Sequence, residues 1–364
     1  MPVRTPASIM DLDEIVARLE PEERFLFERV LHVSVTYGRL VPPPTMIPWI
    51  ERQFGSVEPV INQKIIKVTN LVTLEGVLFN RLRSSRPIWR QEVDLEAELA
   101  RLNHEDPLLR PEELTPEDLF GRVRGAHSIT ASNVAKFDGH HGLIVFDEPH
   151  PLRFTRERLH DYIDTARRWA DLAHAQDPEA RYFFFLWNCL WRAGASLLHG
   201  HAQMMLGRDM HYAKVESLRR AALLYEAHHR SNYFDDLYHA HQVVGAAFEK
   251  EGVRVLANLT PIKEHEVLLM APELNDSLKD RTYEVLETFR DDLKISAFNL
   301  VIYMPPIEPT GENWESFPVI VRIVDRGDPT ARTNDIGAME LYAASVVASD
   351  PLELARRLRK KLGG

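Results

Sequence analysis

The feature that most constrains the fold is an internal repeat that occupies much of the chain after residue 140. Each copy begins with an apolar strand led by a histidine, His141 in the first copy and His265 in the second. A proline turn, an amphipathic helix and a returning strand with an asparagine follow. The strand, helix and returning strand are expected at 141–149, 155–175 and 182–188, and again at 265–272, 276–293 and 297–303. The repeat predicts an α+β fold in which one module is duplicated.

The remaining segments set the expected domain boundaries. Residues 1–60 are predicted to form a helical N-terminal extension, because apolar residues recur at helical spacing from Asp11 to Tyr37 before the break Pro42-Pro-Pro44. A strand-like stretch from Lys64 to Phe79 opens the first module, at 61–213. The second module is expected at 214–364 and begins with a helix from about Lys214 to Lys250 that joins the halves.

Composition excludes several classes of protein. The hydrophobic content of 45% suits a globular core, and the net charge of -10 argues against a surface for nucleic acid or acidic membranes. No run of about 18 apolar residues and no basic, then apolar, amino terminus is present, so a cytoplasmic protein is expected. Cys189 is the single cysteine, which excludes an intrachain disulfide and a zinc site built on a cysteine pair.

Two histidines and a glutamine alternate in His199-Gly-His201-Ala-Gln203. Because the turn-like Gly194-Ala-Ser196 precedes them and an apolar stretch follows, we expect a strand, whose period of two places all three side chains on one face. The sequence also contains His239-Ala-His241, but within the expected helix these positions point about 200° apart. That second pair is expected to be structural.

The chemistry suited to the alternating row is nucleotidyl transfer. A neutral imidazole, with an unperturbed pKa of about 6.5, can attack an α-phosphorus near pH 7 without a metal. Its other nitrogen must carry a proton and be held by an acceptor such as a backbone carbonyl. Ser196, three residues before His199, could donate a hydrogen bond to a leaving or bridging oxygen.

The row lies within a longer pattern that resembles the histidine-triad superfamily, and specifically its transferase branch. That branch includes galactose-1-phosphate uridylyltransferase, ADP-glucose phosphorylase and the diadenosine tetraphosphate phosphorylases. Its pattern is matched by Asn188, Gly194, Ser196, His199, His201 and Gln203, and its upstream strand by His141-Gly-Leu-Ile-Val-Phe-Asp-Glu-Pro-His150. The resemblance implies two tandem modules of the histidine-triad type, with antiparallel sheets flanked by helices.

The resemblance also implies roles for individual residues. His201 would be the nucleophile, His199 would support it, and Gln203 would bind the nucleotidyl phosphate, where an uncharged amide favours transfer over hydrolysis. His141 is expected in the active site. Residues expected to bind substrate are Asn188, Gly194, Arg83, Arg86, Asn133 and Lys136.

Other features of the family are altered in this chain. The cysteine pair of the classical zinc site is absent, so no metal and no cofactor is expected to be required. A family His-X-His strand in the second half is replaced by Ile320-Val-Arg322, and His265 has no catalytic companions, which predicts a degenerate second module. The resemblance also suggests a homodimer.

The function predicted from the sequence is that of a nucleotidyltransferase or phosphorylase acting through a covalent nucleotidyl-His201 intermediate. Its donor would be a nucleoside diphosphate sugar or a dinucleoside polyphosphate, and its acceptor phosphate or a sugar phosphate. A nucleotide hydrolase of the same superfamily and a non-catalytic nucleotide-binding protein are the alternatives. The base, the sugar and the acceptor stay open, because pocket walls assembled from distant segments determine them.

Overall fold

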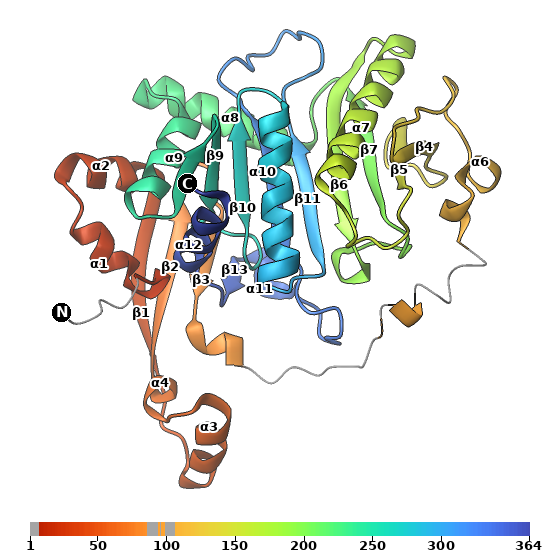
Figure 1. Cartoon of the computed structure of the whole chain (residues 1–364). Coiled ribbons are helices and arrows are strands. Elements are labelled where there is room, and N and C mark those ends of the chain that lie inside the picture. Colours follow the sequence, from red (N-terminus) through yellow and green to blue (C-terminus); the bar gives the residue numbers. More distant parts are fainter. Residues whose placement is uncertain (1–6, 86–93, 95, 99–105) are drawn as a thin grey trace.

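A computed structural model describes residues 7–85, 94, 96–98 and 106–364 of the chain. It has an α+β structure built on a nine-stranded sheet and a smaller four-stranded sheet (Figure 1). Both sheets, and the helices that cover them, contribute to the hydrophobic core.

The nine-stranded sheet is antiparallel throughout. Its strands in spatial order are β4 (Ser128–Ser132), β5 (His140–Phe146), β7 (His201–Arg208), β6 (Ala180–Cys189), β11 (Phe298–Tyr303), β12 (Val319–Asp325), β10 (Val267–Ala271), β9 (Val253–Ala257) and β8 (Ala247–Lys250). Outward from the seam between β6 and β11, the order is β7, β5, β4 on one side and β12, β10, β9 on the other. The predicted repeat is therefore confirmed, and its copies form one continuous sheet.

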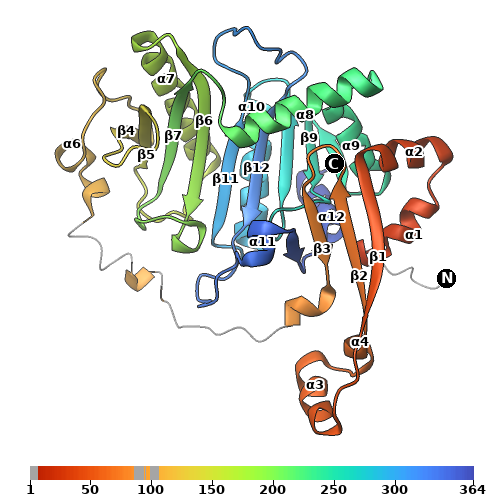
Figure 2. The same ribbon diagram turned by 180° about the vertical axis from the view of Figure 1, so that it is seen from behind.

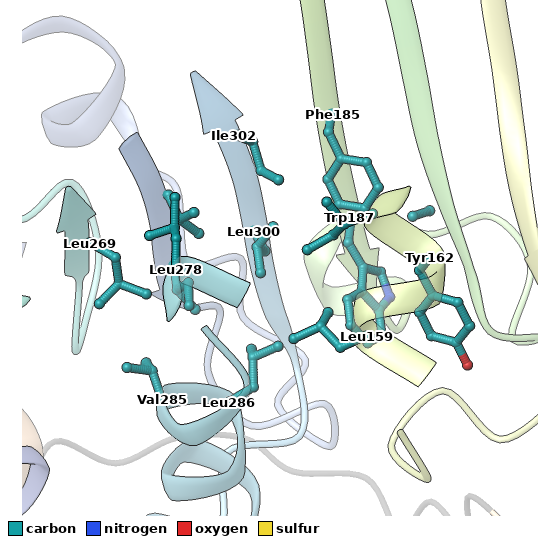
Figure 3. Packing of buried hydrophobic residues seen from close by; sticks show 14 of the residues in the cluster. Leu159, Tyr162, Phe185, Trp187, Leu269, Leu278, Val285, Leu286, Leu300 and Ile302 are labelled. Atoms are coloured by element: carbon teal, nitrogen blue, oxygen red, sulfur yellow. The ribbon is translucent and has the colours of Figure 1, made fainter. Parts of the chain in front are cut away.

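The two repeated helices, α7 (Arg156–Gln176) and α10 (Asp276–Glu287), pack on the same face of this sheet (Figure 1). Each begins at a side-chain cap, since Thr155 accepts a hydrogen bond from the third residue of α7 and Asn275 does so for α10. Figure 3 shows Trp187 of β6 and Leu300 of β11 in one buried cluster with residues of both helices. The two modules consequently share a core. Among the described residues, none of the helices has the length and apolar character needed to cross a bilayer.

The segment between the modules differs from the single helix expected over 214–250. It forms α8 (Ala213–His229), α9 (Tyr233–Val243) and then strand β8. Arg230 ends α8 in a left-handed conformation with φ 57°, and the side chain of Asn232 accepts hydrogen bonds from two backbone N–H groups that begin α9. These local caps stabilise two shorter helices over one long one.

The N-terminal extension is not wholly helical, which corrects the prediction for residues 1–60. Helices α1 (Leu12–Ala17) and α2 (Pro21–Val30) form, but Leu31–Arg39 is strand β1. Val33, Val35 and Thr36 favour a strand once β2 (Asn62–Asn70) is available to pair with it. The four-stranded sheet has the order β1, β2, β3 (Gly76–Phe79), β13 (Ser345–Val347), and its last pair is parallel.

Four short helices complete the described structure. The first two, α3 and α4, lie at the far end of the β1–β2 hairpin (Figure 2). The four short helices are α3 (Ile47–Phe54), α4 (Glu58–Ile61), α6 (Pro111–Leu114) and α11 (Ala338–Tyr342). The C-terminal helix is α12 (Pro351–Leu362).

Candidate active site

The alternating row lies at the start of β7. Ala202 and Met204 point into the core beneath α7, so His201 and Gln203 point to the opposite face of the sheet. Figure 2 views the sheet from that side, with α7 behind it. His199 precedes the strand by two residues and is buried. The row is thus held by a central strand of the large sheet.

Gly200, between the two histidines, is required by close packing. A Cβ atom there would lie 2.6 Å from a ring carbon of Phe146 and 3.0 Å from the carbonyl oxygen of Glu148. The backbone N–H of Gly200 donates to the carbonyl of Pro149, and its carbonyl accepts from the N–H of Phe146. The glycine therefore lets the chain run directly against the end of β5 between the two imidazoles.

His201 has the arrangement expected of a nucleophilic imidazole. Its Nδ1 lies 2.8 Å from the carbonyl oxygen of His199, and a carbonyl can only accept, so the ring proton is on Nδ1. The lone pair is then on Nε2, to which no described residue forms a hydrogen bond. Burial lowers the pKa of His201 below the usual imidazole value, and the side chain of this residue is 6% exposed. His201 is consequently neutral near pH 7, with one nitrogen free.

His199 is held by Asp106, a residue that no sequence pattern indicated. Nδ1 of His199 lies 2.7 Å from a carboxylate oxygen of Asp106, and its Nε2 lies 3.0 Å from the carbonyl oxygen of Phe146. Both ring nitrogens of His199 therefore face acceptors, which holds the ring in one orientation. Burial alone would raise the pKa of Asp106, but hydrogen bonds from His199 and from the backbone of Leu108 lower it overall. The result is a buried histidine–carboxylate contact at the residue two positions before the nucleophile.

Gln203 contacts the other predicted active-site histidine. Its Oε1 lies 2.9 Å from Nε2 of His141, which is fully buried on β5. Asn133 is close by, with Nδ2 3.2 Å from the same ring nitrogen and Oδ1 accepting from the backbone N–H of Ala135. The structure therefore brings His141, Gln203 and Asn133 together.

Asn188 connects the row to the second module. It lies opposite Asn299 in the β6–β11 register, and Oδ1 of Asn188 accepts a hydrogen bond of 2.7 Å from Nδ2 of Asn299. Gly194, on the loop that follows, has a φ of 98° that favours glycine, and a Cβ there would lie 3.9 Å from Nδ2 of Asn188. The amide nitrogen of Asn188 thus faces this loop.

The remaining catalytic candidate, Ser196, and the other residues expected to bind substrate are placed differently. Ser196 is exposed on the loop before His199. Lys136 has its ammonium group on the hydroxyl of Ser132 at 2.6 Å and the carbonyl of His141 at 3.0 Å, so it braces its own loop. Arg83 is exposed and lines a pocket of about 560 Å³ with Lys263 and Arg326, and the lining of this pocket does not include His199, His201 or Gln203. Arg86 lies outside the described residues.

Cys189, His241 and His265, which lie outside the row, have structural partners. Within the described parts of the chain, no group of three or more histidine, cysteine, aspartate or glutamate side chains is arranged to hold a metal ion. Cys189 is buried beside the carbonyl of Ser296.

The second His-X-His pair, in α9, is structural. His241 is buried there, and its Nδ1 donates to the carbonyl of Leu237 while its Nε2 accepts from the N–H of Leu259. His239 is exposed. His265 pairs with Asp325 at 3.1 Å.

Comparison with known proteins supports a shared fold. No protein-family model matches the sequence, and no curated protein does. Among solved structures, ADP-glucose phosphorylase from Arabidopsis thaliana with bound ADP-glucose has a TM-score of 0.62 at 16% identity, over 80% of this chain and 97% of that one. A galt-like protein from Arabidopsis thaliana has a TM-score of 0.57 at 16% identity, over 71% and 92%. A uridylyltransferase has a TM-score of 0.55 at 16% identity, over 68% of this chain and 88% of that one. The chain therefore shares the fold of these three proteins.

Proposed function

We propose that this protein is a nucleotidyltransferase or phosphorylase that forms a covalent nucleotidyl intermediate on His201. The observation that carries the proposal is the hydrogen bonding of the His201 ring. Its Nδ1–H is fixed by the carbonyl of His199, and its Nε2 lone pair is free of protein partners among the described residues. A buried, neutral and oriented imidazole is suited to attack phosphorus.

The proposed reaction has two displacements. Nε2 of His201 attacks the α-phosphorus of the donor, so that a P–N bond forms while the P–O bond to the leaving phosphate or sugar phosphate breaks. A phosphate oxygen of the acceptor then attacks the same phosphorus. The P–N bond breaks, and its electron pair returns to Nε2.

Gln203 supports transfer as the outcome. Its amide has no acidic proton to give and can hydrogen-bond the bound phosphate, so that the intermediate persists until a phosphate-bearing acceptor arrives. A row with an ionisable group at this position would supply an acid. The alternative of hydrolysis predicts that water resolves the intermediate equally well.

The structural neighbours support one class of donor. ADP-glucose is bound in one of them, and another is a uridylyltransferase. Nucleoside diphosphate sugars are therefore the donors to test first, with dinucleoside polyphosphates as the second class. Inorganic phosphate and hexose phosphates are the acceptors.

The test is direct trapping of the intermediate. The protein is incubated with ADP-glucose, UDP-glucose or diadenosine tetraphosphate labelled at the α-phosphorus, denatured, and examined for acid-labile label on histidine. We expect label on the wild type and none on His201→Ala. His239→Ala is the matched control, because His239 belongs to the exposed His-X-His of α9.

Three results would count against the proposal. Equal labelling of wild type and His201→Ala would place any covalent step elsewhere. Absence of label with every donor, together with tight nucleotide binding by calorimetry, would favour the non-catalytic alternative. Release of label as free nucleotide, at a rate unaffected by phosphate or hexose phosphate, would identify a hydrolase.

A further inference from the structure

His141 has a single protonation pattern that its surroundings permit. The backbone N–H of Phe137 donates to Nδ1 of His141 at 2.9 Å, so Nδ1 must carry the lone pair. The proton of the neutral ring is then on Nε2, which lies 2.9 Å from Oε1 of Gln203. The direction of this hydrogen bond is therefore from His141 to Gln203.

The same direction fixes which end of the Gln203 amide faces the ring. With the amide turned over, the buried Nε2–H of His141 would lose its acceptor, because the other side chain near this nitrogen, Asn133, already presents its NH2 group to it at 3.2 Å. Asn133 cannot take the place of Gln203 as the acceptor, because its Oδ1 is committed to the N–H of Ala135 and its Nδ2 faces the ring. Gln203 thus presents its oxygen to His141 and its NH2 group away from it.

The environment of His141 preserves this neutral form. The residue has no exposed surface, and the ring of Phe137 stacks on it with centroids 4.5 Å apart and an interplanar angle of 27°. Phe137 itself is 72% exposed and so acts as a cover. Burial lowers the pKa of His141, with a smaller effect in the same direction from nearby Lys136, and the hydrogen bond to Gln203 opposes both. Both ring nitrogens are occupied, which leaves neither for acid or base catalysis.

We propose that His141 is a positioning residue that orients the Gln203 amide so that its NH2 group donates to the phosphate bound at His201. The inference rests on the proposed function and adds to it the origin of the amide's orientation. His201 and Gln203 are two residues apart on one strand, a separation of about 7 Å, which a phosphoryl group can span. An inverted amide would present its oxygen to an anionic phosphate and repel it.

The kinetic test compares neighbouring histidines. We expect His141→Leu to slow formation of the nucleotidyl intermediate by about 10- to 100-fold, while the dissociation constant of the donor changes much less. His141→Gln retains a donor near the position of Nε2 and should recover part of the rate. His140→Leu is the matched control, since His140 is adjacent in sequence but its ring contacts Asp177 at 2.9 Å.

A double-mutant cycle shows whether His141 acts through Gln203. In a Gln203→Met background, adding His141→Leu should have no further effect on the labelling rate. If the two losses multiply, or if His141→Leu labels at the wild-type rate, His141 does not position the amide.

A separate measurement keeps the inference testable even if no donor labels the protein. In ligand-free protein labelled with ¹⁵N-histidine, the His141 ring, assigned by comparison with His141→Gln, should show a protonated Nε2 and an unprotonated Nδ1 at pH 7.5. Observation of the opposite tautomer or of an imidazolium would overturn the proposed orientation. Absence of label with the expected tautomer would instead reject the proposed function alone.

Discussion

Nδ2 of Asn299 donates a hydrogen bond of 2.7 Å to Oδ1 of Asn188, which lies opposite it across the seam between the two modules. Asn299 makes a second hydrogen bond of 2.8 Å to the carbonyl of Ala193, and its own Oδ1 accepts from Arg326. A residue of the module without the histidine row therefore holds both an expected substrate contact and the loop that leads to His199.

Asn299→Ala should impair the site from the neighbouring module. We expect stability to fall by about 1 kcal/mol for each hydrogen bond lost, and donor affinity to fall because Asn188 and the loop are no longer fixed. Urea unfolding and calorimetric titration measure the two effects. Asn334→Ala, on an exposed part of the same module, is the control, and an equal loss of donor affinity there would contradict this role for Asn299.

Asp106→Ala should be severely damaging, because it leaves the His199 ring buried without its charged partner. Losing a buried hydrogen bond to a charged group costs about 1.5–3 kcal/mol, and we expect labelling of His201 to drop about tenfold because His199 is no longer held. Asp106→Asn retains an acceptor, so its labelling rate and stability should lie between those of the wild type and of Asp106→Ala. Asp94→Ala, at an exposed aspartate whose carboxylate accepts the N–H of Ala97, is expected to label as wild type and to lose only about 1 kcal/mol of stability as a helix cap. A wild-type result for Asp106→Ala would show that His199 needs no carboxylate.

The pH profile of labelling should reflect the buried nucleophile. Burial lowers the pKa of His201, so the free lone pair persists below the usual imidazole value of about 6.5. We expect a constant rate of intermediate formation from about pH 8 to 6.5, and a decline only at lower pH as Nε2 is protonated. Rapid-quench labelling across this range measures the profile. A midpoint above that of a free imidazole would mean that the ring is stabilised in its charged form.

His241 should contribute to acid unfolding. Burial lowers its pKa to about 4, and its Nε2 must accept the N–H of Leu259. In the unfolded chain the His241 ring binds a proton at about pH 6.5. The contribution of the neutral ring to the free energy of unfolding is therefore complete above that pH, and about 3 kcal/mol of it is lost as the pH falls towards 4. His241→Gln should lower stability at neutral pH but flatten its dependence between these values. Urea unfolding at several pH values, with His239→Gln as control, tests this; an unchanged slope for His241→Gln would refute it.

The parts of the fold that were predicted correctly are those whose local pattern matches their final environment. Amphipathic spacing indicated α7 and α10, and apolar runs indicated β6 and β11, because each of these elements buries one face in the shared core. Strand β1 was expected to be helical because its pairing partner, β2, begins 23 residues after it ends, from Arg39 to Asn62. A pattern read locally does not include that partner.

The site was predicted unevenly for a similar reason. A strand's period was enough to relate His201 and Gln203, but His199 lies before β7, so the expectation that all three side chains share one face of a strand was wrong for His199. Asp106 is 93 residues from His199. Its one local role is to cap the short 3-10 helix Pro107–Leu109, where its side chain accepts a hydrogen bond from the N–H of Leu108. Lys136 carries the charge expected of a phosphate ligand, yet only the folded loop shows that its ammonium group is occupied.

Removing the second module would expose an edge of β6. Residues 185–189 of this strand pair with β11, and the strand carries the run Phe183-Phe-Phe-Leu-Trp187. An unpaired apolar edge of this kind is a template for aggregation between chains. The second module, which has no His-X-His-X-Gln row, thus covers this apolar edge of the first.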